Sequence, residues 1–154
     1  MMFQELEKYK ENDSFIFSLN DELGDVCNAP DSNNKAGIYL VYDLTHNELI
    51  YIGISGQLQK GVFKFRKDGI KGRLVKGKQF EERKARKIAW KIKMKEDKIQ
   101  KLKVDWYVTY DEVFVFDYPE ILEAQFLKEF KKDNDNKLPK WNKSEGRKNT
   151  NTEI

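Results

Sequence analysis

Residues 37–43, GIYLVYD, and residues 49–54, LIYIGI, decide the fold that the sequence predicts. Both runs are rich in β-branched and aromatic side chains, which are enriched in β-strands. The five residues between them, LTHNE, suit a tight turn. Because strands joined by so short a connection pair antiparallel, we expect a β-hairpin over residues 37–54.

Further elements follow this hairpin along the chain. Glycines make residues 55–79 loop-like, with one short helix, whereas residues 80–100 carry apolar side chains at helical spacing. Residues 102–110 alternate as a third strand does, and residues 113–116 extend it or begin a fourth. Residues 119–131 open on a proline and form a second long helix. The sum is an α+β, or mixed α/β, domain in which helices pack on a small antiparallel sheet.

The ends of the chain differ from this central part in composition. Residues 1–13 are typical of a short charged helix, and residues 20–36 are a loop rich in Asn, Asp, Gly and Pro. We therefore expect an N-terminal helical extension over 1–35, a main domain over 36–143 and a disordered tail over 144–154. With a single cysteine, no signal peptide and no membrane-spanning run, the protein is expected to be soluble and cytoplasmic.

Positive charge is concentrated in one third of the chain. Residues 60–103 hold 18 of the 29 Lys and Arg residues but only 5 of the 26 Asp and Glu residues. Their net charge is +13, while the remainder of the chain carries −10. Such a cationic segment is typical of a protein that binds a polyanion, although a solvated lysine-rich surface has the same composition.

The basic residues predict where a nucleic acid would bind. Within the helix expected over 80–100, lysines recur at spacings of three and four, which places them on one face. This stripe is suited either to phosphate contacts or to a solvated surface. The side chains that we expect to contact DNA are Lys60, Lys64, Arg66, Lys76, Lys78, Lys84, Lys87 and Lys91.

One carboxylate does not fit the amphipathic pattern of its helix. On a helical wheel of residues 119–131, Glu123 falls near the middle of the apolar stripe that includes Leu122, Phe126 and Leu127. A carboxylate on this face must be paired, protonated or bound to a metal, because burying it alone is very unfavourable. Glu123 is therefore either half of a buried ion pair or a metal-binding or acid–base group in a cleft.

Several short motifs together resemble those of the GIY-YIG nuclease family. Gly37-Ile38-Tyr39 and Tyr51-Ile52-Gly53 match the two tripeptides that define this family. Residues 70–74, IKGRL, resemble the helix that carries the family's arginine, and residues 121–127, ILEAQFL, resemble the helix that carries its metal-binding glutamate. Residues 138–142, LPKWN, resemble the closing segment with its asparagine. The resemblance covers about residues 36–143 and implies a three-stranded antiparallel sheet flanked by helices.

The resemblance implies a role for each matching side chain. Glu123 would coordinate one divalent cation, magnesium (Mg²⁺) or in its place manganese (Mn²⁺). Arg73 would hold the scissile phosphate and stabilise the charge of the transition state. Tyr39 and Tyr51 would converge on the attacking water, one as general base or both as hydrogen-bond partners, and Asn142 would steady the site.

Two departures from the family pattern leave alternatives open. Arg73 lies twenty residues after Gly53, behind an inserted glycine-rich loop, so Arg66 is a second candidate for the phosphate-binding arginine. Many relatives carry a histidine one turn beyond the arginine, where this chain has Gly77. The residues that could act in its place are Lys60, Lys64 and Lys76. His46 falls in the predicted turn, and we expect it to be exposed and not catalytic.

These residues together predict a metal-dependent endonuclease that hydrolyses phosphodiester bonds in double-stranded DNA. The subclass favoured is a type II restriction endonuclease, because a domain of this size must find its target with its own loops, commonly as a homodimer that cuts both strands. The alternatives are a structure-specific nuclease of repair or of mobile elements, and a catalytically silent nucleic-acid-binding protein of the same fold.

Overall fold

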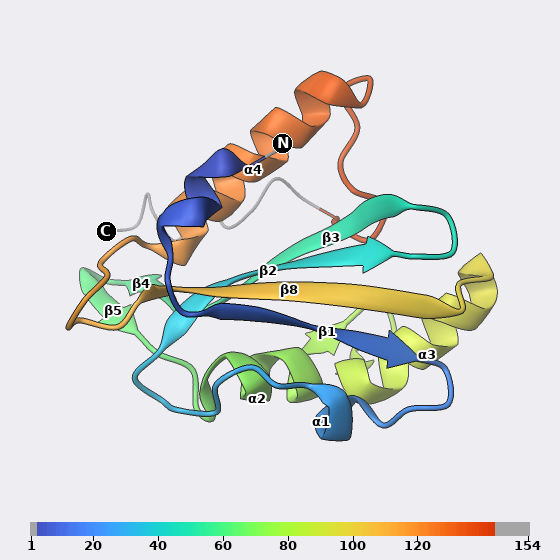
Figure 1. Ribbon diagram of the computed structural model, residues 1–154, viewed down its shortest axis with the longest axis horizontal. Coiled ribbons are helices and arrows are strands. Elements are labelled where there is room, and N and C mark those ends of the chain that lie inside the picture. The colour runs from blue at the N-terminus through green and yellow to red at the C-terminus, as the bar shows by residue number, and fades with distance from the viewer. Residues whose placement is uncertain (1–2, 144–154) are drawn as a thin grey trace.

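The computed structural model describes residues 3–143, and its centre is one antiparallel sheet of four strands (Figure 1). The strands lie in the order β1-β8-β2-β3, so β1 and β3 form the two edges. Their bounds are Asn12–Ser18 for β1, Ala36–Asp43 for β2, Glu48–Ser55 for β3 and Lys101–Tyr110 for β8. The predicted hairpin is confirmed as β2 and β3, and the predicted third strand as β8.

The edge strand β1 is the main departure from the predicted sheet of three strands. Residues 12–18, NDSFIFS, pair antiparallel with β8. Phe15 and Phe17 are buried while Ile16 between them is exposed, which is the alternation of a strand with one face on the core. An apolar run of only three residues does not predict a strand, and the partner strand lies far along the chain. The helix expected over the first residues is reduced to a 3-10 helix, η1, at Gln4–Lys8.

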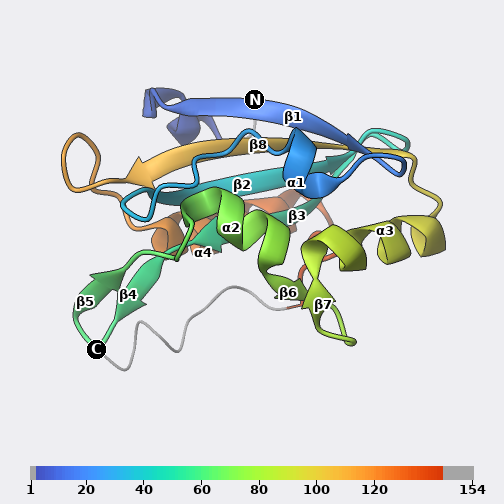
Figure 2. The ribbon, with the colours of Figure 1, turned by 90° about the horizontal axis from the view of Figure 1, so that it is seen from below.

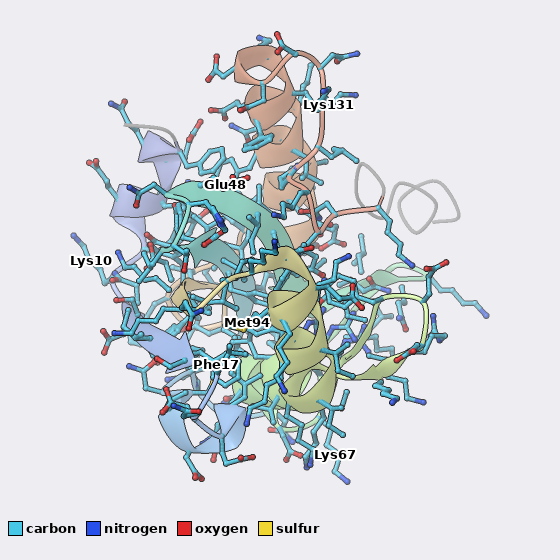
Figure 3. All side chains as sticks on the ribbon, turned by 90° about the vertical axis from the view of Figure 1, so that its right-hand side faces the viewer. Lys10, Phe17, Glu48, Lys67, Met94 and Lys131 are labelled. Carbon is cyan, nitrogen blue, oxygen red and sulfur yellow. The ribbon has the colours of Figure 1, made fainter. Side chains whose placement is uncertain are left out.

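Three helices cover one face of the sheet, as Figures 1 and 2 show. The core between these helices and the sheet contains Phe17 on β1, Tyr39 on β2 and Trp90 and Met94 on α3. In Figure 3, Phe17 and Met94 lie on the same side of the sheet. The bounds of the three helices are Leu23–Val26 for α1, Gly69–Lys76 for α2 and Arg86–Asp97 for α3.

The opposite face is covered by η1 and by α4, which spans Pro119–Asp133 and begins at the proline, as predicted. The rings of Phe3 and Phe126 stack there with their centroids 4.3 Å apart. Ile38 packs in this second core, whereas Tyr39, its neighbour on β2, packs in the first. The central strand β2 is therefore buried on both faces, and the sheet separates two layers of helices.

The glycine-rich region between β3 and α3 contains two small hairpins and α2. The first hairpin projects from one end of the molecule (Figure 2), and the second directly precedes α3. The helix expected over 80–100 accordingly begins only at Arg86, because the residues before it pair as strands. The hairpin strands are Gln57–Gln59 for β4, Val62–Lys64 for β5, Lys78–Gln79 for β6 and Lys84–Ala85 for β7.

The segment between β8 and α4 is a loop and not a fourth strand. The carboxylate of Asp111 accepts hydrogen bonds from the backbone N–H groups of Val113, Phe114 and Val115, which turns the chain tightly. The segment 144–154, expected to be a disordered tail, lies outside the described residues. Among the helices of residues 3–143, none combines the length and the apolar character needed to cross a membrane.

We expect Phe17→Ala to lower the free energy of unfolding by about 3–5 kcal/mol, because the ring is fully buried between β1 and α3. Ile16→Ala, on the exposed face of the same strand, serves as the control and should change stability by less than about 1 kcal/mol. Urea denaturation of both variants measures the difference. Equal losses would contradict the docking of β1 on the core.

Candidate active site

A pocket of about 280 Å³ lies beside the edge strand β3, where the helical layers of the two sheet faces meet. Tyr51 comes from β3 itself, Arg73 from α2 on one face, and Glu123 from α4 on the other. Four of the five side chains predicted to form a site therefore line one pocket. The full lining is Tyr51, Ile54, Arg73, Lys78, Gln79, Phe80, Arg83, Glu123, Trp141, Asn142 and Lys143.

Arg73 reaches this pocket because α2 is amphipathic. Ile70 and Leu74 are fully buried against the sheet, and Arg73 lies at the edge of this buried face, beside Ile70. Arg66, the second candidate for the phosphate-binding arginine, does not line the pocket that contains Glu123. It lines a separate groove next to this pocket. The geometry thus favours Arg73 of the two.

Although Glu123 is an ionisable residue, it is only 7 % exposed. It lies on the same buried face of α4 as the apolar residues Leu122, Phe126 and Leu127. The wheel therefore located a carboxylate that is largely removed from water and forms part of a pocket wall. Among residues 3–143, no group of three or more His, Cys, Asp or Glu side chains could hold a metal ion. One carboxylate beside an open pocket nevertheless fits Mg²⁺, which keeps several water ligands and shares others with substrate phosphates.

The two tyrosines of the hairpin lie side by side, with ring centroids 6.2 Å apart, but only Tyr51 lines the pocket. Tyr39 is fully buried behind it, and its hydroxyl makes no hydrogen bond within the described part of the chain. Burial raises the pKa of Tyr39 to about 12, although the positive charges of Arg86 and Arg73 act in the opposite direction. Tyr39 is therefore poorly suited to be a general base, and Tyr51 is the hydroxyl that a ligand can reach.

The two glycines of the hairpin motif have clear packing reasons. A Cβ atom at Gly53 would lie 2.5 Å from ring atoms of Tyr39, which stands opposite it in the β2–β3 register. A Cβ atom at Gly37 would lie 1.8 Å from the carbonyl oxygen of Tyr107 on β8. The first glycine thus makes room for the buried tyrosine, and the second lets β8 approach β2 closely.

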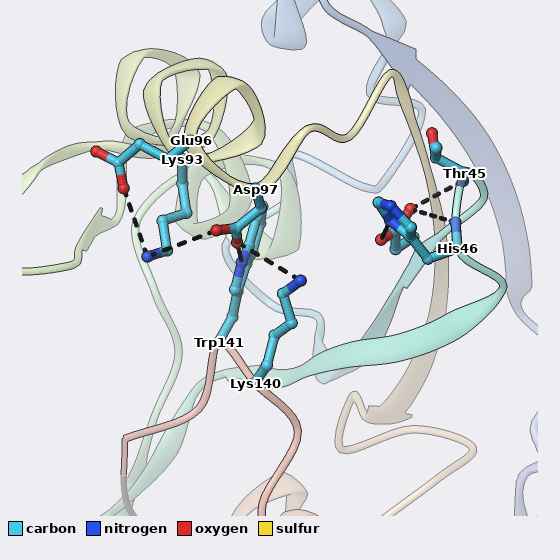
Figure 4. A network of polar contacts seen from close by, with 8 residues as sticks. Thr45, His46, Lys93, Glu96, Asp97, Lys140 and Trp141 are labelled. Carbon is cyan, nitrogen blue, oxygen red and sulfur yellow. Dashed lines mark hydrogen bonds and ion pairs between the residues drawn. The ribbon is translucent and has the colours of Figure 1, made fainter.

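Asn142 fastens the C-terminal segment to the edge of β3. Its side-chain oxygen accepts the N–H of Ile52 at 3.0 Å, and its side-chain nitrogen donates to the Ile52 carbonyl at 3.1 Å. The adjacent Trp141 donates its indole N–H to Asp97 on α3, which also lies 3.8 Å from the ammonium of Lys140 (Figure 4). Asn142 therefore holds the C-terminal segment against the β3 backbone at Ile52, next to the pocket-lining Tyr51.

His46 lies in the turn between β2 and β3, as Figure 4 also shows. Its side chain is 44 % exposed, and Nδ1 lies 2.6 Å from the carboxylate of Asp43. It does not line the pocket beside β3. The prediction that His46 is exposed is confirmed, and its contacts are those of a turn residue.

Arg86 is the residue at this site that the sequence reasoning missed. It is 1 % exposed, and its guanidinium donates to the hydroxyl of Tyr51 at 3.0 Å and to the carbonyl oxygen of Arg73 at 2.7 Å. The sequence does contain a signal for this residue: Arg86 is spaced at helical intervals from Ala89 and Trp90, and all three lie on the buried stripe of α3. That is the same anomaly that revealed Glu123.

A wide basic groove of about 900 Å³ adjoins the pocket and shares four of its lining residues. Seven of its ten lining residues are basic, against one acidic residue, Asp68. We call it the basic groove and define it by Arg66, Lys67, Asp68, Gly72, Arg73, Lys76, Gly77, Lys78, Arg83 and Lys143. Its composition is suited to a phosphate backbone that runs into the pocket.

The residues predicted to contact DNA fall into two groups, those that line the basic groove and those that lie outside it. Arg66, Lys76 and Lys78 line the basic groove, to which the structure adds Lys67, Arg83 and Lys143. The other predicted contacts lie outside the groove: Lys60 and Lys64 on the β4–β5 hairpin, Lys84 at a neighbouring pocket, and Lys87 and Lys91 on α3. Lys91 pairs with Glu22 at 3.2 Å, so part of the lysine stripe serves contacts within the protein.

We expect Gly53→Ala to destabilise the protein by about 1–3 kcal/mol, because the added methyl group forces the Tyr39 ring out of its place. Gly24→Ala is the matched control, since a Cβ there makes only an ordinary contact, 3.8 Å from Val75. Guanidinium denaturation of the two variants measures the difference. A Gly53→Ala protein as stable as the control would show that the ring does not need this space.

Comparison with known proteins was made at three levels. No protein-family model matches the chain, no curated protein is similar to it in sequence, and no solved structure matches its fold. The pocket, the basic groove and the side chains that line them are the features that indicate a function.

Proposed function

We propose that this protein is a metal-dependent DNA endonuclease of the GIY-YIG type, which hydrolyses phosphodiester bonds. The observation that carries the proposal is the convergence of Tyr51, Arg73 and Glu123 on one pocket that opens into the basic groove. These side chains come from three different elements, on the two faces and the edge of the sheet. A hydroxyl that orients water, a guanidinium that binds phosphate and a carboxylate that holds a cation can together support phosphodiester hydrolysis.

Arg73 is suited to bind the scissile phosphate. It lines both the pocket and the basic groove, so a phosphate backbone that follows the groove meets it at the pocket entrance. A guanidinium offers a rigid fork of donors to two phosphate oxygens. In the pentacovalent transition state the phosphate gains negative charge, and a fixed donor at this position stabilises it.

Glu123 is suited to hold the divalent cation, Mg²⁺ or Mn²⁺. Its carboxylate forms part of the wall opposite α2, so an ion bound there would lie between the helical layers. Bound at Glu123, such a cation would supply Lewis-acid stabilisation of the phosphate and of the leaving oxygen. Because the protein contributes one carboxylate, the remaining coordination positions stay open to water and to phosphate oxygens.

Tyr51 is suited to orient the attacking water. In the reaction a water oxygen bonds to phosphorus and gives up its proton to the solvent, while the bond from phosphorus to the sugar oxygen breaks and that oxygen leaves as a hydroxyl after taking a proton from the solvent. The Tyr51 hydroxyl is the phenol exposed to the pocket, whereas Tyr39 packs behind it and holds its ring in place. Asn142 keeps the edge of β3 in register through Ile52.

We further propose that double-stranded DNA is the substrate and that the protein is a type II restriction endonuclease acting as a homodimer. One pocket per chain cuts one strand, so a double-strand break calls for two chains. Exposed apolar side chains on β5, on the loop before α4 and on α4 support self-association. We call this set the apolar end surface, and its members, each more than half exposed, are Val62, Val113, Phe114, Phe116 and Ile121.

The charges around the apolar end surface favour a second copy of this chain over DNA as its partner. The β4–β5 hairpin carries Lys60 and Lys64, whereas the loop before α4 carries Asp111 and Glu112. The acidic loop would repel a phosphate backbone. In a two-fold interface each surface meets its own copy, so the basic hairpin of one chain can face the acidic loop of the other.

The cleavage proposal is tested by incubating the protein and supercoiled plasmid DNA with Mg²⁺. We expect nicked and linear products, and we expect Glu123→Gln and Arg73→Ala each to reduce the rate by at least about 10²-fold while DNA binding is largely kept. Arg66→Ala is the matched control and should weaken binding more than it slows cleavage.

The pattern of products separates the classes of nuclease. Discrete fragments from a mapped genomic DNA would support a restriction enzyme, and incision confined to branched or damaged DNA would support a repair or mobile-element nuclease. Binding without cleavage under all metal conditions would overturn the enzymatic proposal in favour of a nucleic-acid-binding protein. Full activity of Arg73→Ala with loss of activity in Arg66→Ala would reverse the assignment of the arginine.

The dimer is tested by sedimentation velocity. We expect the wild-type protein to sediment as a dimer, and Phe114→Asp to sediment as a monomer, because Phe114, at 85 % exposure, is the most exposed member of the apolar end surface. Ile88→Asp, which changes an exposed apolar residue on α3, is the control and should remain dimeric. A wild-type monomer both with and without DNA would exclude the homodimer.

A further inference from the structure

Arg86 is a fully buried cation, and its hydrogen-bond partners within residues 3–143 are all neutral. Its guanidinium donates to the side-chain oxygen of Gln79 at 2.8 Å, to the carbonyl of Arg73 at 2.7 Å and to the hydroxyl of Tyr51 at 3.0 Å. None of these groups carries a negative charge. Burying a charge without a counter-charge is costly, whereas an apolar side chain of similar size would fill the space at no such cost.

The surrounding structure holds this guanidinium in one place. The oxygen of Gln79 also accepts the indole N–H of Trp90 at 2.9 Å, which fixes the amide that binds Arg86. A Cβ atom at Gly77 would lie 2.2 Å from a guanidinium nitrogen of Arg86, so the absence of a side chain at Gly77 leaves the path open. The glycine at the end of α2 and the arginine at the start of α3 are therefore two parts of one arrangement.

The guanidinium lies against both tyrosine rings. Its central carbon is 5.7 Å from the ring centroid of Tyr39 and 5.5 Å from that of Tyr51, within the range of cation–π contacts. Although burial acts to lower the pKa of Arg86, the two phenols outweigh it and raise the pKa. Arg86 thus stays charged beside the wall of the pocket, where a phosphate would bring negative charge.

The hydrogen bond from Arg86 determines what the Tyr51 hydroxyl can do. A guanidinium has only donors, so the oxygen of Tyr51 must be the acceptor in this contact. The hydroxyl hydrogen of Tyr51 is then directed away from Arg86, and Tyr51 lines the pocket. That leaves one O–H donor and one further lone pair of Tyr51 for an oxygen ligand such as water or phosphate.

We propose that Arg86 is a positioning residue, which acts through Tyr51 by holding its hydroxyl toward an oxygen ligand in the pocket. The inference rests on the proposed nuclease function and deepens it, because it assigns a role to a side chain outside the recognised motifs. It also explains why a buried charge is kept at this position. Its test must separate action through Tyr51 from a merely structural contribution.

A double-mutant cycle with Arg86→Met and Tyr51→Phe provides that test. Single-turnover rates with Mg²⁺ measure cleavage, and the dissociation constant of the same DNA with Ca²⁺ in place of Mg²⁺ measures binding. We expect each single variant to slow cleavage by about 10²-fold with little change in binding. Because both changes remove one interaction, the double variant should be about as slow as either single variant.

Two further variants keep the outcome clear. Lys128→Met removes one positive charge from the exposed side of α4 and should cleave at the wild-type rate. If Arg86→Met does not fold, Arg86→Lys replaces it in the cycle. The single side-chain nitrogen of lysine cannot contact Gln79, Arg73 and Tyr51 together. The melting temperature of each variant reports on folding independently of cleavage.

The possible results distinguish this inference from the proposed function. If the wild-type protein cleaves DNA but the losses of the two single variants multiply in the double variant, Arg86 does not act through Tyr51. The proposed nuclease function would then still stand. Weakened DNA binding by Arg86→Met at an unchanged cleavage rate would also overturn it. Absence of cleavage by the wild-type protein would overturn the proposed function, and the inference with it.

Discussion

The contact between the Tyr39 ring and the backbone of Gly53 is the constraint on which the site depends. The two residues stand opposite each other in the β2–β3 register, and no side chain larger than hydrogen fits beneath the ring. Since side chains alternate along a strand, this register also places Tyr51 beside Tyr39 on the same face. A shift of one residue would turn Tyr51 to the other face, away from Arg86 and Arg73, so the packing of one ring sets the geometry of the pocket.

The position of the pocket follows from the layered architecture. A sheet covered on both faces has no room for a ligand above its centre, and its two edges are β1 and β3. At the β3 edge, α2 from one layer and α4 from the other each contribute a charged side chain to the pocket. Because the basic residues of the sequence are concentrated between β4 and β8, the basic groove opens at the same edge. The order of the elements along the chain therefore places the pocket and the basic groove at the same edge of the sheet.

Two buried charges mark this region, and both depart from the amphipathic pattern of their helices. Glu123 lies on the apolar face of α4, and Arg86 lies on the apolar face of α3. A protein selected for stability alone would replace such residues by apolar ones, because desolvating a charge opposes folding. The proposed chemistry gives a reason for both, since a phosphate and a divalent cation would each place an opposite charge near one of these side chains.

The sequence by itself determined the strands β2, β3 and β8 and the helix α4, because their periodicity is local and strong. It also singled out Glu123, since a carboxylate within an apolar stripe is visible on a helical wheel. Only the tertiary structure decided that β1 joins the sheet, that Tyr39 is buried behind Tyr51, and that Arg73 rather than Arg66 reaches the pocket. It also revealed Arg86, whose contacts with Tyr51 and the Arg73 carbonyl join segments well apart in the chain. Periodicity records which face of an element is buried, whereas the partner of that face depends on how distant segments pack.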